Sequence, residues 1–171
     1  MFQKMSPATQ LTASLSLMLI IGISLVWASD YYSNSVVVPR GKKGNSSMTV
    51  VKNGGKDKVE VLIRKHTLEP YMDEMGVDEV EVTVDAVVDH VTGGAASYYA
   101  FDFTFGPAGA YFEPKLLELI FKGQYASERT EVWLYDENGE AVEGIRNDNA
   151  DHTVFYIPHF SSYTYDNYDE Y

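Results

Sequence analysis

Apolar and polar residues alternate along most of the chain from residue 48 onward, and this period of two predicts β-strands. The clearest case is residues 80–84, where Val80, Val82 and Val84 are separated by polar residues. Successive side chains of a strand point to opposite faces, so such a segment buries one face and exposes the other. The pattern predicts about eight strands, at residues 48–51, 59–63, 80–84, 99–105, 116–121, 131–135, 141–145 and 153–165.

Turn signals between these strands indicate antiparallel hairpins. Asn-Gly pairs at residues 53–54 and 138–139 each lie between two apolar runs, and glycine accepts the positive φ that tight hairpin turns need. Residues 66–78 contain a proline, a glycine and several acidic residues, so we expect a loop or one helical turn there. The predicted fold class is an all-β antiparallel β-sandwich at residues 48–165, preceded by an N-terminal hydrophobic helix.

The first 28 residues are predicted to be a targeting segment. Lys4 is their only charged residue, residues 11–28 are mostly apolar, and small or β-branched residues precede the end of this run at Ala28. A positively charged N-terminus, a short apolar core and small residues before the cleavage site are typical of a secretory signal peptide. The alternative is an uncleaved membrane anchor, because the 18-residue run approaches the about 20 residues that span a bilayer. Either interpretation places the domain outside the membrane, secreted or at the cell surface.

The segments that flank the expected sandwich are polar. Residues 29–47 are rich in Tyr, Ser, Asn, Gly and Lys and predict a linker, with one apolar patch at residues 36–38. Pro39 ends this patch, which suits an edge strand because proline cannot donate to a sheet. Asn45 begins an Asn-Ser-Ser sequon, which marks either a glycosylation site or an unmodified loop. Residues 166–171 form an acidic, tyrosine-rich tail, predicted as a disordered end or a partner-binding peptide.

Charge and cysteine content exclude several classes of partner and site. The chain has 13 Lys and Arg against 25 Asp and Glu, a formal net charge of −12 at pH 7. Such a surface repels the phosphates of nucleic acids and of anionic lipids, so we expect neither as a direct partner. Cysteine is absent, which leaves no disulfide and no thiolate metal site. Membrane contact is expected only through residues 11–28, if they are retained.

The strand expected at residues 153–165 carries the strongest chemical motif, His159-Phe160-Ser161. The Ser161 hydroxyl directly follows the Phe160 carbonyl, and its attack would move the acyl group from nitrogen to oxygen, leaving an ester that water hydrolyses. His159 could assist the proton transfer near neutral pH. In the alternative interpretation Phe160 fills the core, His159 makes a polar contact and Ser161 pairs in the sheet.

A second motif resembles part of a known family. The Phe-Gly-Pro-Ala-Gly stretch at residues 105–109 is followed by Phe112, Pro114 and the expected strand at residues 116–121. This arrangement resembles a recurring segment of prokaryotic surface-protein domains. Those domains are similar to the module shared by zonula-occludens proteins, netrin receptors, ankyrins and the death-domain protein PIDD.

The resemblance extends over residues 48–165. Residues 59–68 and 80–84 are similar to the early strands of that module, and His159-Phe160-Ser161 with Tyr163 resembles its closing part. The resemblance implies a β-sandwich with an interaction role. In some relatives it also implies self-cleavage between the Phe and the Ser of the triplet.

Metal-binding signals are weaker. The four histidines lie too far apart in sequence for the short spacings of a zinc site: His66, His90, His152 and His159. Asn147, Asn149 and Asp151 alternate like the start of a calcium loop, but the glycine and the closing glutamate of such a loop are missing. They are calcium candidates, with a plain polar turn as the alternative, and no other cofactor is expected.

These observations favour an exported, non-enzymatic β-sandwich that acts as a structural or protein-interaction module for an unknown protein or cell-surface partner. One alternative is an autoproteolytic domain that cleaves between Phe160 and Ser161. A second alternative is a carbohydrate-binding sandwich, in which Trp133 and exposed tyrosines line a sugar face. Trp133 equally suits core packing, because Val132 and Leu134 flank it.

Overall fold

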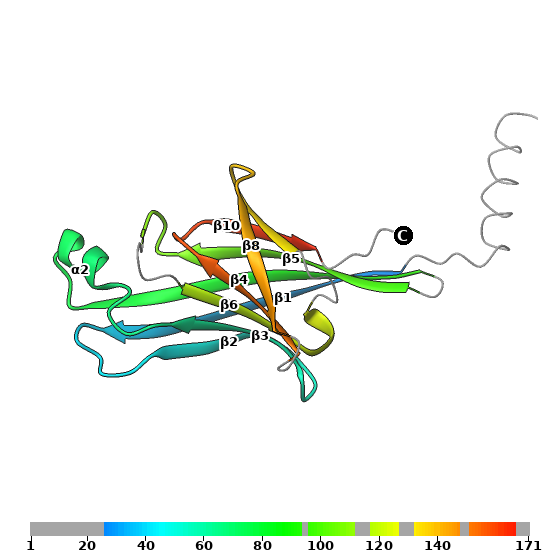
Figure 1. The fold of residues 1–171 in the computed structure, drawn as a ribbon, viewed down its shortest axis with the longest axis horizontal. Coiled ribbons are helices and arrows are strands. Elements are labelled where there is room, and N and C mark those ends of the chain that lie inside the picture. The colour runs from blue at the N-terminus through cyan, green and yellow to red at the C-terminus, as the bar shows by residue number, and fades with distance from the viewer. Residues whose placement is uncertain (1–25, 94–95, 112–116, 127–131, 148–150, 167–171) are drawn as a thin grey trace, which may run out of the picture.

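The computed structural model describes residues 26–93, 96–111, 117–126, 132–147 and 151–166. These residues form ten β-strands and two short helices (Figure 1). The strands are β1 (Val26–Pro39), β2 (Ser46–Asn53), β3 (Asp57–Ile63), β4 (Glu79–Gly93), β5 (Ala96–Gly106), β6 (Leu117–Lys122), β7 (Val132–Asp136), β8 (Ala141–Asn147), β9 (His152–Ile157) and β10 (Ser162–Asp166). The helices are α2 (Glu69–Met75) and the 3-10 helix η1 (Gly123–Tyr125).

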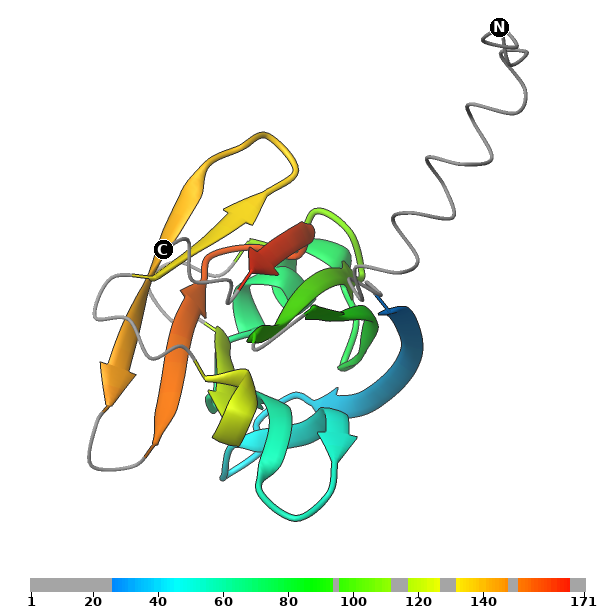
Figure 2. The ribbon, with the colours of Figure 1, turned by 90° about the vertical axis from the view of Figure 1, so that its right-hand side faces the viewer.

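All ten strands belong to one antiparallel sheet, in the order β1-β4-β5-β10-β7-β8-β9-β6-β3-β2. The sheet curls until its two edge strands, β1 and β2, contact each other (Figure 2). The Asn34 side-chain amide of β1 donates to the Thr49 carbonyl of β2 over 2.7 Å, so the sheet is nearly closed. The predicted mostly antiparallel β architecture is therefore confirmed.

Aromatic side chains from non-adjacent strands fill the inside of the curled sheet. Phe101 and Phe103 of β5 contact Phe121 of β6, with ring centroids 5.2 and 5.7 Å apart. Tyr165 of β10 lies 4.4 Å from the same Phe121 ring. All four side chains are at most 1% exposed. Each fully buried side chain of this size contributes about 1.5–3 kcal/mol, so this cluster makes a substantial contribution to stability.

The structure has ten strands where the sequence predicts about eight, and one of the two additions is β1. β1 pairs with β4 over its whole length, from Val26 opposite Thr92 to Pro39 opposite Glu79. Most of the segment predicted as a linker is therefore part of the sheet. The expectation of an edge strand at residues 36–38 is confirmed, because β1 ends the strand order and Pro39 is its last residue.

The other additional strand comes from residues 153–165, which the sequence predicts as one strand. These residues form two strands, β9 and β10, which have different neighbours in the sheet. Residues 66–78, where the sequence predicts a loop or one helical turn, contain the short helix α2, which has proline in its first turn and is capped by Gly76 with φ 66°.

The predicted N-terminal segment and C-terminal tail lie largely outside the described residues. Residues 1–25 and 167–171 are not described, so the signal peptide, the anchor and the tail stay predictions. In the part of the chain that the structure describes, no helix is both long and apolar enough to cross a membrane.

Candidate functional site

His159-Phe160-Ser161 lies in the connection between β9 and β10, so its predicted place within a strand is wrong. β9 ends at Ile157 and β10 begins at Ser162. Pro158 follows β9 directly, and without an N–H it cannot continue the hydrogen-bond ladder. β7 and β8 lie between β9 and β10 in the sheet, so the triplet carries the chain from one part of the sheet to another.

The backbone around the Phe160–Ser161 peptide bond is held on both sides by the end of β5 and the segment that follows it. The Phe160 N–H donates to the Ala110 carbonyl over 2.8 Å, and the Phe105 N–H donates to the Ser161 carbonyl over 3.0 Å. Tyr111 also forms an isolated antiparallel bridge with the residue before Phe160. The Phe-Gly-Pro-Ala-Gly motif and the closing triplet are therefore neighbours in space.

The surroundings of Gly106 explain why the Phe-Gly-Pro-Ala-Gly motif has a glycine at its second position. A Cβ at Gly106 would lie 2.5 Å from Oγ1 of Thr83 on β4, much closer than carbon and oxygen approach each other without a bond. Any larger residue would displace either Thr83 or the end of β5. Because Phe105 holds the Ser161 carbonyl, such a shift would reach the candidate site.

The His159 imidazole is engaged by Asp136 and Tyr163. Its Nε2 lies 3.8 Å from Oδ2 of Asp136, and its Nδ1 lies 3.4 Å from the Tyr163 hydroxyl. That hydroxyl donates to the His159 carbonyl over 2.9 Å, and burial raises the pKa of the phenol, so it stays a donor at neutral pH. The ring also stacks on Tyr111 with 6.1 Å between centroids.

Asp136 is fixed by the turn that links β7 to β8. Its Oδ1 accepts the N–H groups of Asn138 over 2.9 Å and Glu140 over 2.7 Å. The side chain is only 2% exposed, which leaves Oδ2 to face the imidazole. The sequence indicates the hairpin turn, but it gives no sign that this carboxylate supports His159 from a different part of the sheet.

Ser161 and Phe160 are both buried. The Phe160 ring is 3% exposed and stacks on Phe105 with 6.1 Å between centroids, as expected of a core residue. Ser161 is 9% exposed, and its Oγ has no hydrogen-bond partner among the described residues. The structure brings the three residues of the triplet together, but it places the imidazole on Asp136 and Tyr163 rather than on the Ser161 hydroxyl.

An open pocket of about 370 Å³ borders the triplet. His159 and Ser161 line it together with Thr104 of β5, Tyr111 and Glu137. The wall thus combines hydroxyl groups, aromatic rings and a carboxylate. Water has access to the neighbourhood of the Phe160–Ser161 bond through this opening.

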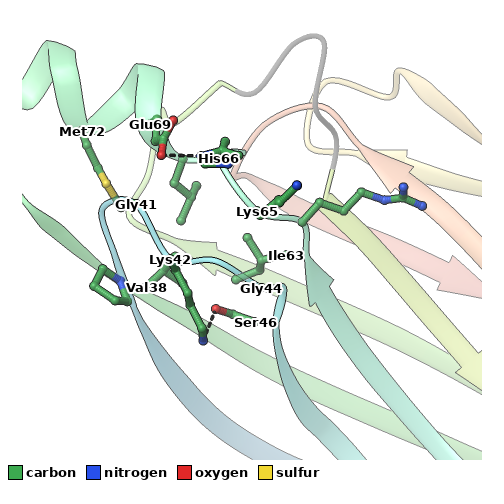
Figure 3. A pocket seen from close by; sticks show the side chains of 13 residues that line it. Val38, Gly41, Lys42, Gly44, Ser46, Ile63, Lys65, His66, Glu69 and Met72 are labelled. Carbon is green, nitrogen blue, oxygen red and sulfur yellow. Dashed lines mark hydrogen bonds and ion pairs between the residues drawn. The ribbon is translucent and has the colours of Figure 1, made fainter.

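A second, narrower pocket lies between the β1–β2 connection and the β3–α2 connection (Figure 3). In it Lys42 donates to Ser46 over 2.8 Å, and His66 Nδ1 lies 2.6 Å from Glu69 Oε1 (Figure 3). Nearby, the exposed Asn45 accepts the Lys65 N–H through its side-chain oxygen over 3.1 Å. Its amide nitrogen is the atom that a glycan would modify, and glycosylation there stays a prediction.

The metal candidates are not brought together among the described residues. His90 stacks on Tyr99, with 4.6 Å between ring centroids, and no described group of three or more His, Asp or Glu side chains is placed to hold a metal ion. Asp151 is exposed in a turn, and Asn149 and the side chain of Asn147 lie outside the described part, so calcium binding stays a prediction.

Trp133 lies on the outer face of β7, where it is 42% exposed, rather than in the core. Tyr135, two residues further along the same strand, is 48% exposed. Both alternate with the buried Val132 and Leu134, as side chains of a half-buried strand do, so the alternative of core packing for Trp133 is wrong.

Comparisons with protein-family models, with curated proteins and with solved structures find no match for this chain.

Proposed function

We propose that this chain is an exported, non-enzymatic β-domain that acts outside the membrane as a structural or protein-interaction module. The apolar segment at residues 11–28 and the resemblance to surface-protein domains support export.

We further propose that the two halves of the curled sheet correspond to the layers of a β-sandwich. The contacts of Phe101 and Phe103 on β5 with Phe121 on β6 support this, because they join strands from the two halves.

The main support for a non-enzymatic role is that residues of the closing triplet, His159-Phe160-Ser161, take part in packing. Phe160 stacks on Phe105 in the core, and His159 lies between Asp136 and Tyr163. A serine nucleophile needs a base within about 3 Å of its oxygen. No hydrogen bond joins His159 to Ser161 in the part of the chain that is described.

Two measurements on cells test this proposal. Protease added to intact cells should degrade the domain if it is exported, while a cytoplasmic marker stays intact. A photo-crosslinking amino acid placed in turn at the exposed positions Tyr31, Met75 and Tyr135 should give a defined protein adduct from at least one of them. Protection of the domain from protease, or the absence of adducts from all three positions, would contradict the proposal.

A second candidate function is self-cleavage between Phe160 and Ser161, favoured by the buried Ser161 Oγ that has no described partner. In this reaction Oγ bonds to the Phe160 carbonyl carbon, the C–N bond breaks and the Oγ proton passes to the nitrogen. Water then hydrolyses the ester to a Phe160 carboxylate. The imidazole of His159 would have to turn away from Asp136 and Tyr163 to assist the proton transfer.

Intact-mass measurement under denaturing conditions separates the two candidates. A non-enzymatic domain gives one species ending at Tyr171, with the same processing in the wild type and in Ser161→Ala. Self-cleavage gives one fragment ending at Phe160 and a second fragment beginning at Ser161. Ser161→Ala should then abolish the cut, whereas the neighbouring Ser162→Ala should leave it in place.

A third candidate, carbohydrate binding, is favoured by the exposure of Trp133 and Tyr135 on one face of β7. Exposed aromatic rings offer flat apolar surfaces with polar edges. Retention of the purified domain on an array of neutral glycans, lost in Trp133→Ala but not in Met75→Ala, would support it. Equal retention of the two variants would count against it.

A further inference from the structure

The faces of β1, β4, β5, β10 and β7 that point away from the core form one continuous surface, because these strands are consecutive in the sheet. Strand pairing places one residue of each strand in a single row: Tyr31, Val87, Asp102, Thr164 and Tyr135. At about 4.8 Å between strands, this row is about 19 Å long. The outer aromatic face is defined by five side chains on or beside this row: Tyr31, Asp85, Asp102, Trp133 and Tyr135.

Three large aromatic side chains are exposed on the outer aromatic face. Tyr31 is 68%, Tyr135 48% and Trp133 42% exposed. Tyr31 lies on one edge strand of the sheet, and the other two lie on β7, at the far end of the row. Trp and Tyr are enriched among the residues that dominate binding energy at protein interfaces. Their separation suits an extended ligand that crosses several strands.

The charge of these five strands is of one sign. They contain eight Asp and Glu and no Lys or Arg. By contrast, seven of the 13 Lys and Arg of the chain lie between residues 42 and 65, around β2 and β3. The sequence therefore separates positive charge from negative charge across the sheet, and the outer aromatic face is on the negative side.

The carboxylates of this surface are paired with neutral hydroxyl groups. Asp85 accepts the Tyr31 hydroxyl over 2.9 Å, and Asp102 accepts the Thr164 hydroxyl over 2.8 Å. Hydrogen bonds from Ser33 and Tyr31 lower the pKa of Asp85, so its carboxyl is ionised at neutral pH. Hydroxyl donors orient these oxygens without neutralising them, and their charge remains available to a cation.

We propose that the outer aromatic face binds an arginine- or lysine-rich segment of a partner protein. Cationic side chains would stack on Trp133, Tyr135 and Tyr31 and pair with the carboxylates between them. Charge complementarity selects this occupant, because a second copy bound face to face would oppose like charges. The inference rests on the proposed interaction role and names the chemistry of the partner.

Isothermal titration of the full chain with a ten-residue peptide of alternating Arg and Ser tests the inference. The peptide should bind at low salt and weaken as salt rises. Trp133→Ala and Tyr135→Ala should each weaken binding about tenfold, while Met75→Ala, which also truncates an exposed side chain, leaves it unchanged. Asp102→Asn should weaken binding about three- to fivefold. Glu74→Gln on α2, which removes the same charge elsewhere, should have no effect.

Several results would overturn the inference. Equal losses of peptide affinity for Asp102→Asn and Glu74→Gln would mean that binding depends only on the net charge of the domain. A concentration-dependent dimer that Trp133→Ala abolishes would make the occupant a second copy, and binding of a neutral oligosaccharide at Trp133 without peptide binding would make it a sugar. If the peptide fails to bind while cross-linking on cells still gives a defined protein adduct, the interaction module stands and only the cationic partner is refuted.

Discussion

Ser161→Ala should stabilise the domain, because it removes a buried hydroxyl that has no described hydrogen-bond partner. Leaving such a group unsatisfied costs about 1–3 kcal/mol. The lost oxygen forfeits a few dispersion contacts of about 0.1–0.2 kcal/mol each. The net expectation is a gain of about 1 kcal/mol in the free energy of unfolding, or roughly 4 °C in Tm for a domain of this size.

Urea denaturation of the wild type and of the variant, each first shown by mass to be uncleaved, measures this difference. Ser162→Ala is the matched control. The Ser162 hydroxyl lies 3.3 Å from the Thr104 hydroxyl at the surface, so its loss should change stability by less than about 0.5 kcal/mol. A Ser161→Ala protein less stable than the wild type would refute the reasoning, since it would mean that the hydroxyl makes a favourable hydrogen bond.

Three further predictions concern the surroundings of the site and the core. Gly144→Ala should destabilise the domain by about 1–3 kcal/mol in urea, because the new Cβ would lie 2.6 Å from atoms of Phe155 and Val132. Asp136→Ala should cost about 3 kcal/mol in the same assay, since two backbone N–H groups lose a charged acceptor. Burial raises the pKa of Tyr125 to about 12, above its unfolded value of about 10. Its contribution to stability is complete below pH 10 and should be lost as pH rises to 12, which urea titrations across that range would detect.

The strands that could be predicted are those with one face buried and one exposed. Val80, Val82 and Val84 of β4 are buried, while Glu81 and Thr83 between them are exposed, and a period of two is visible directly in such a segment. The sequence also identifies the aromatic core strand β5 for the same reason. The signal is local, so no knowledge of the partner strand is needed.

The part of β1 before residue 36 could not be recognised in this way, because its outward-facing side chains bond to residues that are distant in sequence. Ser29 donates to Asp89 over 2.5 Å and Tyr31 donates to Asp85 over 2.9 Å, so these two polar residues have their partners on β4. A segment rich in Ser, Tyr and Asn resembles a linker until that pairing is known. The identity of the neighbouring strand is a tertiary property, which one sequence does not contain.

The candidate site also has one part that is visible in the sequence and another part that is not. The adjacent residues His159, Phe160 and Ser161 could be found from the sequence, because adjacency alone defines the motif. The groups that decide its chemistry come from elsewhere: Asp136 from the end of β7 and Phe105 from the end of β5. Without those positions, the sequence could not tell whether the imidazole faces the serine or the carboxylate.

The pairing of β10 determines what cleavage at Phe160–Ser161 would do to the protein. β10 is hydrogen-bonded to β5 on one side and to β7 on the other, and its Tyr163 and Tyr165 side chains are each 1% exposed. A cut before β10 would therefore leave β10 in the sheet, because its backbone ladder and buried rings are unaffected. A native mass or a gel-filtration profile would look the same for cut and uncut protein. A denaturing measurement distinguishes them, because it separates two fragments that the sheet would otherwise hold together.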